Sequence, residues 1–154
     1  MVVNDDIVFV ARMLLAAILS FAIGWERETR GSPAGDRTYA LIGLGAAAFT
    51  SVGVDAFPAT AEKLIAGVVT GVGFLGAGMI LKEGRDVIGL TTAASIWAVA
   101  AVGVVVGAGE YLMGVTLTFV ILLVLEMDRL PLLSWFEAGN TIRRRSAESR
   151  SRDT

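Results

Sequence analysis

The chain has 154 residues, of which 55% are hydrophobic and 18% are charged, and its formal net charge is −2. It contains no cysteine and no histidine, which excludes disulfides, thiol redox chemistry, imidazole general bases and the usual zinc sites. A bound metal would have to be a hard cation such as Mg²⁺ or Ca²⁺, held by oxygen ligands, and the sequence assigns it no ligands and no other cofactor. No basic surface interleaved with aromatic residues is present, so we expect no nucleic-acid partner.

Apolar segments dominate the chain, and each is near the ~20 residues that cross the ~30 Å hydrocarbon core of a bilayer. We predict an all-α, polytopic membrane protein, a bundle of five transmembrane helices in a single domain over residues 1–129. Residues 130–154 are expected to form an interfacial segment and a basic, disordered cytoplasmic tail. The five segments are Ile7–Ile23, Tyr39–Val54, Leu64–Leu81, Leu90–Ala108 and Leu112–Leu125, with Tyr39 and Tyr111 expected at the lipid–water interface.

The first segment contains a charge, Arg12, and its leader carries Asp5 and Asp6 rather than the basic residues of a cleavable signal peptide. A charge within a span either faces the bundle interior or extends to the headgroups. Small and polar residues recur with Arg12 every four positions, which favours a ridge that faces other helices rather than lipid. The ridge consists of Arg12, Ala16, Ser20, Gly24 and Glu28.

Charged residues crowd the connection between the first two segments. They can be structural ion pairs that seal the helix ends, or a binding or gating site, and we expect Arg37 to pair with Glu26 or Glu28. Ser32 or Asp36 is a candidate N-cap for the second helix, and the fourth helix has similar candidates in two threonines. The candidate functional cluster comprises Glu26, Arg27, Glu28, Asp36, Arg37, Thr38, Thr91 and Thr92.

The third segment spells G-x-G-x-x-G from Gly71 to Gly76, the dinucleotide-binding fingerprint. That fingerprint needs a strand before it and a soluble βαβ unit around it, and neither is expected here. Glycines at this density instead let helix backbones approach closely in lipid, so we predict tight packing of the third and fourth helices and self-association, with a dimer favoured. The candidate packing residues are Gly67, Gly71, Gly73, Gly76 and Gly78.

Basic residues are distributed unevenly between the two sides of such a bundle. The first and third connections and the tail hold eleven of them, and the opposite side holds only Lys63. By the positive-inside rule, the N-terminus lies outside and the C-terminus lies in the cytoplasm.

Four motifs together resemble the MgtC/SapB family of bacterial inner-membrane proteins. They are Gly24-Trp25-Glu26-Arg27-Glu28, Ala34-Gly35-Asp36-Arg37-Thr38, Gly71-Val72-Gly73-Phe74-Leu75-Gly76-Ala77-Gly78-Met79-Ile80 and Gly89-Leu90-Thr91-Thr92-Ala93-Ala94. The resemblance covers roughly Arg12 to Gly109. It implies a protein of the inner membrane that is tied to Mg²⁺ homeostasis in low Mg²⁺, to virulence in pathogens, and to contacts with other membrane proteins such as the F-type ATP synthase. Several members carry a soluble C-terminal domain, whereas only a short tail follows the fifth segment here.

Two hypotheses for function follow. In the first, the chain is a non-enzymatic regulator that works by helix–helix contact in the membrane. In the second, it is a small transporter or channel for Mg²⁺ or another cation. No nucleotide-binding G-x-x-x-x-G-K-[ST] loop is present, so an ATPase is not expected. Transport would favour acidic groups at mid-membrane, and the absence of such groups from the five segments favours the regulator.

Overall fold

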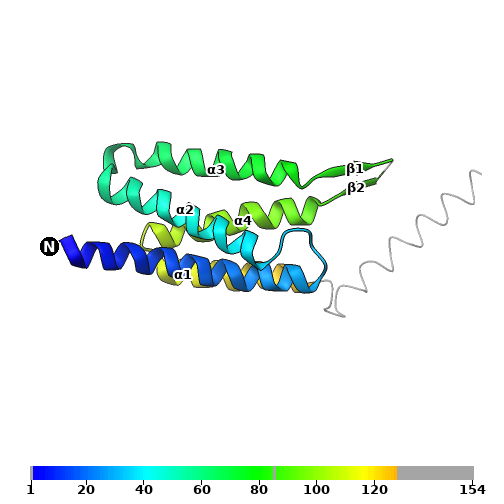
Figure 1. The fold of residues 1–154 in the computed structure, drawn as a ribbon, viewed down its shortest axis with the longest axis horizontal. Coiled ribbons are helices and arrows are strands. Elements are labelled where there is room, and N and C mark those ends of the chain that lie inside the picture. The colour runs from blue at the N-terminus through cyan, green and yellow to red at the C-terminus, as the bar shows by residue number, and fades with distance from the viewer. Residues whose placement is uncertain (1, 85, 128–154) are drawn as a thin grey trace, which may run out of the picture. The chain divides into compact units, whose positions relative to one another are not determined.

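The computed structural model describes residues 2–84 and 86–127, with side chains from residue 5 onward, and this part of the chain is almost entirely helical (Figure 1). The expected interfacial segment and tail, residues 130–154, lie outside the described residues. The chain divides into two compact units, Met1–Ile121 and Leu122–Thr154, and the bundle described below is the first unit. Its helices are α1 (Val2–Thr29), α2 (Asp36–Ala56), the short 3-10 helix η1 (Pro58–Thr60), α3 (Ala61–Gly78), α4 (Leu90–Gly107) and the start of α5 (Tyr111–Glu126).

The all-α membrane-type fold predicted from the sequence is confirmed. Four of the helices, α1 to α4, are long and apolar enough to cross a membrane. The fifth, α5, is equally apolar but has only 16 residues, so its crossing stays a prediction.

The connection between α3 and α4 differs from the expected loop. The third segment was predicted to run to Leu81, but α3 ends at Gly78, and β1 (Leu81–Glu83) then pairs antiparallel with β2 (Asp86–Ile88). Gly84 permits the tight turn between the strands because its φ of 62° lies in the left-handed region that glycine adopts freely. The two strands form a hairpin that projects beyond the ends of α3 and α4 (Figure 1).

The hairpin and the α1–α2 connection lie at the same end of the bundle, called the hairpin end here (Figure 1). The other end, called the η1 end, carries η1 and the α4–α5 connection. Arg27, Arg37 and Lys82 therefore lie toward the hairpin end and Lys63 toward the η1 end, which is the separation of basic residues that the sequence predicted.

Helix α2 packs most extensively against α1 and next against α4. The α2–α4 contact is backbone to backbone, whereas the sequence analysis expected the tight contact between the third and fourth helices. A Cβ atom added to Gly107 would lie 2.6 Å from the Ala47 carbonyl oxygen, and one added to Gly103 would collide with the Gly43 carbonyl oxygen. Small residues at four-residue spacing on α4 thus set how closely it approaches α2.

The small residues of the α1 ridge face another helix, as predicted, and that helix is α2. Ala16 and Ser20 are fully buried, and a side chain at Gly43 of α2 would collide with Ser20. A Cβ atom added to Gly24 would lie 2.6 Å from the Asp36 Cα atom. Leu14 and Ile18, which lie off the ridge, are exposed and suited to lipid.

The glycines of α3 do not pack as closely within the chain as expected. Gly76 meets α4, where an added Cβ atom would lie 3.3 Å from the Ala93 carbonyl oxygen. The other four candidate packing residues have open space where their side chains would be, so replacing Gly71 is not expected to disturb the fold of the single chain. They are Gly67, Gly71, Gly73 and Gly78.

Candidate functional site

Glu26 is the buried centre of a charge cluster at the hairpin end, with only 9% of its surface exposed. Its carboxylate forms an ion pair with Arg30 one helical turn later, and the Arg27 Nη1 atom lies 3.9 Å from its Oε2 atom. Glu26 and Arg27 lie in the last turn of α1 and Arg30 directly follows the helix, so Glu26 and Arg30, four positions apart, lie on one face. A carboxylate buried to this degree needs such partners, because an unpaired buried charge is strongly destabilising.

Glu28 stabilises the start of the next helix. Its Oε2 atom accepts a hydrogen bond from the backbone N–H of Asp36 at 3.1 Å, which places a negative charge at the positive end of the α2 dipole. The N-cap of α2 is Gly35, and a side chain there would collide with the Glu28 carboxylate. The predicted caps Ser32 and Asp36 are therefore wrong, because a carboxylate from the preceding helix takes the capping role.

Arg37 does not form the predicted ion pair with Glu26 or Glu28. Glu26 is paired with Arg27 and Arg30, and Glu28 is directed at the α2 backbone, so neither carboxylate is placed to meet Arg37. The Arg37 side chain is instead exposed. It lines an open hollow of about 530 Å³, together with Glu28, Ser32, Pro33, Gly35, Asp36 and Thr38.

Hydroxyl groups connect the α1–α2 connection to α4. The Ser32 and Thr92 side-chain oxygens lie 3.2 Å apart, and the Tyr39 hydroxyl lies 2.5 Å from the Ser95 Oγ atom. The helix α4 begins at Leu90 with Gly89 as its N-cap, so the predicted caps Thr91 and Thr92 lie inside its first turn. Gly89 has a φ of 86°, and a side chain there would collide with the Met79 carbonyl oxygen.

Tyr39 was expected at the lipid–water interface, but its side chain is fully buried. The α1–α2 connection brings the chain back so that the first turn of α2 packs between α1 and α4. Arg27 lies close enough to the Tyr39 hydroxyl to interact with it electrostatically. The buried polar groups of three helices thus meet at the hairpin end.

Arg12 lies in a second polar cluster, at the η1 end. Its Nη1 atom donates to the Asp55 Oδ2 atom at 3.0 Å and to the Gly107 carbonyl oxygen at 3.2 Å, and its Nε atom lies 3.4 Å from the Tyr111 hydroxyl oxygen. The Arg12 side chain is 15% exposed and that of Asp55 is 52% exposed. Arg12 therefore holds the ends of α2, α4 and α5 to α1, in agreement with a side chain that faces the bundle.

The candidate residues predicted from the sequence fall into three groups. Glu26, Arg27 and Thr92 belong to the buried network, and Thr91 is exposed beside it. The hollow gathers Glu28, Asp36, Arg37 and Thr38. Arg12 is at the opposite end of the bundle.

Sequence reasoning missed several partners of these residues. Ser32 was considered only as a helix cap, and Ser95 and Arg30 were not singled out as partners. Asp55 was not singled out, although a lone acid at the end of one span could have been matched to the lone Arg12 within another. Among the described residues, no three acidic side chains gather into a group that could hold a metal ion.

Comparisons with known proteins agree with the motifs. The model of the MgtC family matches residues 13–130. YhiD of Escherichia coli K12 is 46% identical over 128 residues, which are 77% of this chain and 60% of YhiD. SrpB of Synechococcus elongatus is 42% identical over 140 residues, 80% of this chain and 77% of SrpB. MgtC of Salmonella typhimurium LT2 is 40% identical over 114 residues, 74% of this chain and 49% of MgtC.

The chain thus spans 60% of the length of the first of these relatives. No solved structure matches it. With a family match over most of its length and four helices suited to a bilayer, this chain belongs to the MgtC family and is a multi-pass membrane protein.

Proposed function

We propose that this protein is a non-enzymatic regulator that supports Mg²⁺ homeostasis through contacts with other membrane proteins. In a pathogenic bacterium, the same role would support virulence. The link to Mg²⁺ draws on its relatives, because YhiD is named as a candidate magnesium transporter. The F-type ATP synthase is a candidate partner through the family resemblance. The protein needs no cofactor in this role.

The observation that carries this proposal is the contrast between the exposed hairpin end and the closed bundle interior. At the hairpin end, Arg37 and Thr38 are exposed around an open hollow and available to another protein. In the interior, α1, α2 and α4 meet through Gly43, Gly103 and Gly107, where no added side chain fits. The exposed charges can bind another protein, and the close helix contact at these glycines leaves no path for an ion. This arrangement therefore favours a regulator that acts by contact over a transporter.

We propose further that the bundle sits in the bacterial inner membrane with the hairpin end in the cytoplasm, the N-terminus outside and the C-terminus inside. The support is the excess of basic residues at the hairpin end and in the tail. Single cysteines at Ser32, and at Ser149 outside the described residues, should react in intact cells with membrane-permeant thiol reagents only. A cysteine at Thr60, at the η1 end, should also react with impermeant reagents. Impermeant labelling at Ser32 or Ser149 contradicts this orientation.

The proposed contact role is tested at Arg37. Because Arg37 is exposed and forms no ion pair with Glu26 or Glu28, Arg37→Ala should leave membrane abundance unchanged while growth at limiting Mg²⁺ falls to that of cells lacking the protein. Lysine at this position should restore growth only in part, since it cannot form a two-pronged contact with a carboxylate. Lys82→Ala, which removes another exposed basic side chain at the hairpin end, is the matched control. Normal growth of the Arg37→Ala strain contradicts a role for this surface.

Transport is the second candidate function. The name of YhiD favours it, and purified protein in sealed liposomes loaded with a Mg²⁺-sensitive dye tests it directly. Under the regulator proposal, Mg²⁺ entry should equal that of empty liposomes. Protein-dependent entry that Arg37→Ala leaves unchanged supports the transporter and rejects the regulator.

A further inference from the structure

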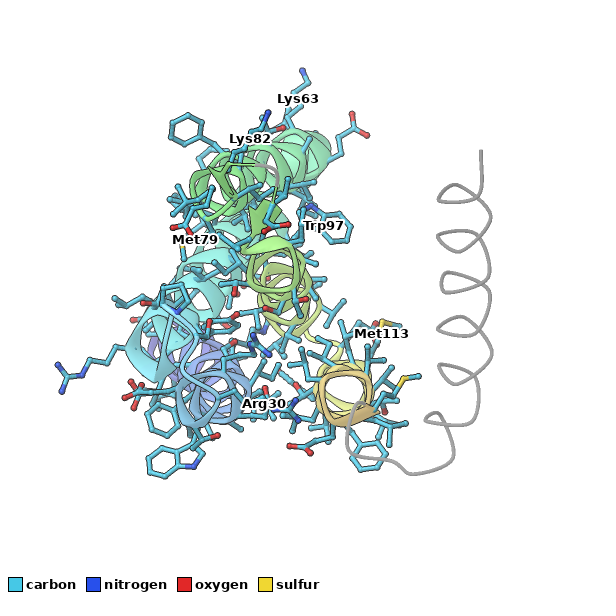
Figure 2. The ribbon with its side chains drawn as sticks, turned by 90° about the vertical axis from the view of Figure 1, so that its right-hand side faces the viewer. Arg30, Lys63, Met79, Lys82, Trp97 and Met113 are labelled. Atoms are coloured by element: carbon cyan, nitrogen blue, oxygen red, sulfur yellow. The ribbon has the colours of Figure 1, made fainter. Side chains whose placement is uncertain are left out.

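A second hollow lies at the hairpin end, beside the one that Arg37 lines. It has a volume of about 280 Å³ and is bounded by the end of α1, the hairpin and the start of α4. Figure 2 looks onto this end of the bundle and labels Arg30 and Met79, which line the hollow from the end of α1 and from the end of α3. Among the described residues, its lining contains Arg27 and Arg30 but no acidic side chain. The hollow is therefore electropositive.

Arg27 carries a charge that is only weakly compensated. Glu26 has one negative charge and pairs most closely with Arg30, while its Oε2 atom lies 3.9 Å from the Arg27 Nη1 atom. The Tyr39 hydroxyl also lies near Arg27, but a phenol is neutral at pH 7. The Arg27 side chain is only 12% exposed, and its Nε atom is buried with no hydrogen-bond partner among the described residues. A buried charge and a buried donor in this position both favour a bound anion.

The start of α4 adds further donors to the hollow. The first backbone N–H groups of a helix have no partner within it and lie at the positive end of its dipole. At α2 the Glu28 carboxylate takes that place, whereas no side chain caps α4 at Gly89. The Ser32 and Thr92 hydroxyls, which also line the hollow, lie 3.2 Å apart. A hydrogen bond between them uses the proton of one hydroxyl, so the other can donate to an anion.

We propose that this hollow binds a phosphate group, with Arg27, the N-terminus of α4 and a hydroxyl of Ser32 or Thr92 donating to its oxygens. Guanidinium groups and helix N-termini are common donors to phosphate in proteins, and both are present here. The proposal holds whether or not the protein acts as a regulator, because it concerns binding by the purified chain.

The phosphate group can belong to an anionic lipid or be free in solution, and the apolar side of the hollow favours the lipid. Leu81 and Ile88 line the hollow and lie opposite each other in the hairpin. They are 56% and 43% exposed, so they can contact an acyl chain whose headgroup is held by Arg27. Basic pockets between transmembrane helices hold lipid headgroups in this way.

Thermal unfolding of the purified full-length protein in detergent detects binding, because a ligand that binds only the folded state raises the unfolding midpoint. The probes are a short-chain phosphatidylglycerol, the matching phosphatidylcholine, inorganic phosphate, and sodium chloride at equal ionic strength. Stabilisation by phosphatidylglycerol alone assigns the site to a lipid headgroup, and stabilisation by inorganic phosphate beyond chloride shows that free phosphate suffices. Midpoints that follow ionic strength alone, or equal effects of the two lipids with none of inorganic phosphate, overturn the proposal.

Ser32→Asp separates binding from folding. Its carboxylate would lie in the hollow with Arg27 and the start of α4, so the midpoint without ligand should equal or exceed that of the wild type. Affinity for the stabilising probe should fall about tenfold or more, since a hydrogen bond to a charged group contributes at least that factor. Arg27→Gln should weaken binding similarly, and Ser32→Asp decides should Arg27→Gln fail to fold.

The matched control is Thr38→Asp, which adds the same charge to an exposed residue at the same end that does not line this hollow. It should keep most of the wild-type affinity. Unchanged affinity in Ser32→Asp, or an equal loss in Thr38→Asp, rejects the site.

Discussion

Glu26→Gln is expected to destabilise the protein by about 3 kcal/mol, the lower end of the range for breaking a buried ion pair. The substitution leaves the guanidinium groups of Arg27 and Arg30 beside a neutral amide in a place where Glu26 is only 9% exposed. The lower end applies because Arg30 has a further interaction. The measurement is the thermal unfolding midpoint in detergent, together with protein abundance in the membrane.

The matched control is Glu28→Gln, which changes an exposed carboxylate two residues away. It weakens one hydrogen bond to the start of α2 and removes a favourable charge at a helix N-terminus, so its cost should be about 1 kcal/mol or less. The double variant Glu26→Gln, Arg30→Gln should lose less than the sum of its two single variants, because removing both partners leaves no uncompensated charge between them. Equal midpoints for Glu26→Gln and Glu28→Gln would show that Glu26 is not the centre of the network.

Gly103→Leu is expected to abolish the folded bundle. An added side chain at this position collides with the Gly43 carbonyl oxygen and lies 2.6 Å from the Ala46 Cβ atom, and the backbone of α2 cannot move aside because α1 packs on its other side. Overpacking of a core typically costs ~1–3 kcal/mol, and a clash with backbone on both helices falls at or above the upper end. Loss of the protein from membranes, or a collapsed unfolding midpoint, is the expected result.

The control for this experiment is Gly73→Leu on α3. The same side chain is added to a glycine in a transmembrane helix, but nothing lies within 4 Å of an added Cβ atom at Gly73. This variant should fold like the wild type. Should both variants fold equally well, close backbone approach between α2 and α4 does not hold the bundle together.

The sequence by itself predicted an all-α membrane protein, the positions of its apolar helices and the end of the bundle at which most basic residues lie. Apolar segments of bilayer length with no cysteine or histidine leave few alternatives, and the four-residue recurrence of small residues from Arg12 to Glu28 identified the buried face of α1. These features could be predicted because length and periodicity are local properties of the chain. The hairpin was missed because strands of three residues are too short to show a period.

Only the tertiary structure decided which charges and which glycines meet. Arg37 is close in sequence to Glu26 and Glu28, yet Arg30 is one helical turn from Glu26 and takes the ion pair, while Glu28 caps α2. The sequence placed the close packing at the glycines of α3, but α2 packs against α1 and α4, so Gly103 and Gly107 are in close contact whereas Gly67 and Gly71 remain open. Arg12 and Asp55 are 43 residues apart and meet because α1 and α2 run antiparallel. Residue spacing shows which face of a helix is buried. Which neighbouring helix covers that face depends on how all the helices pack together.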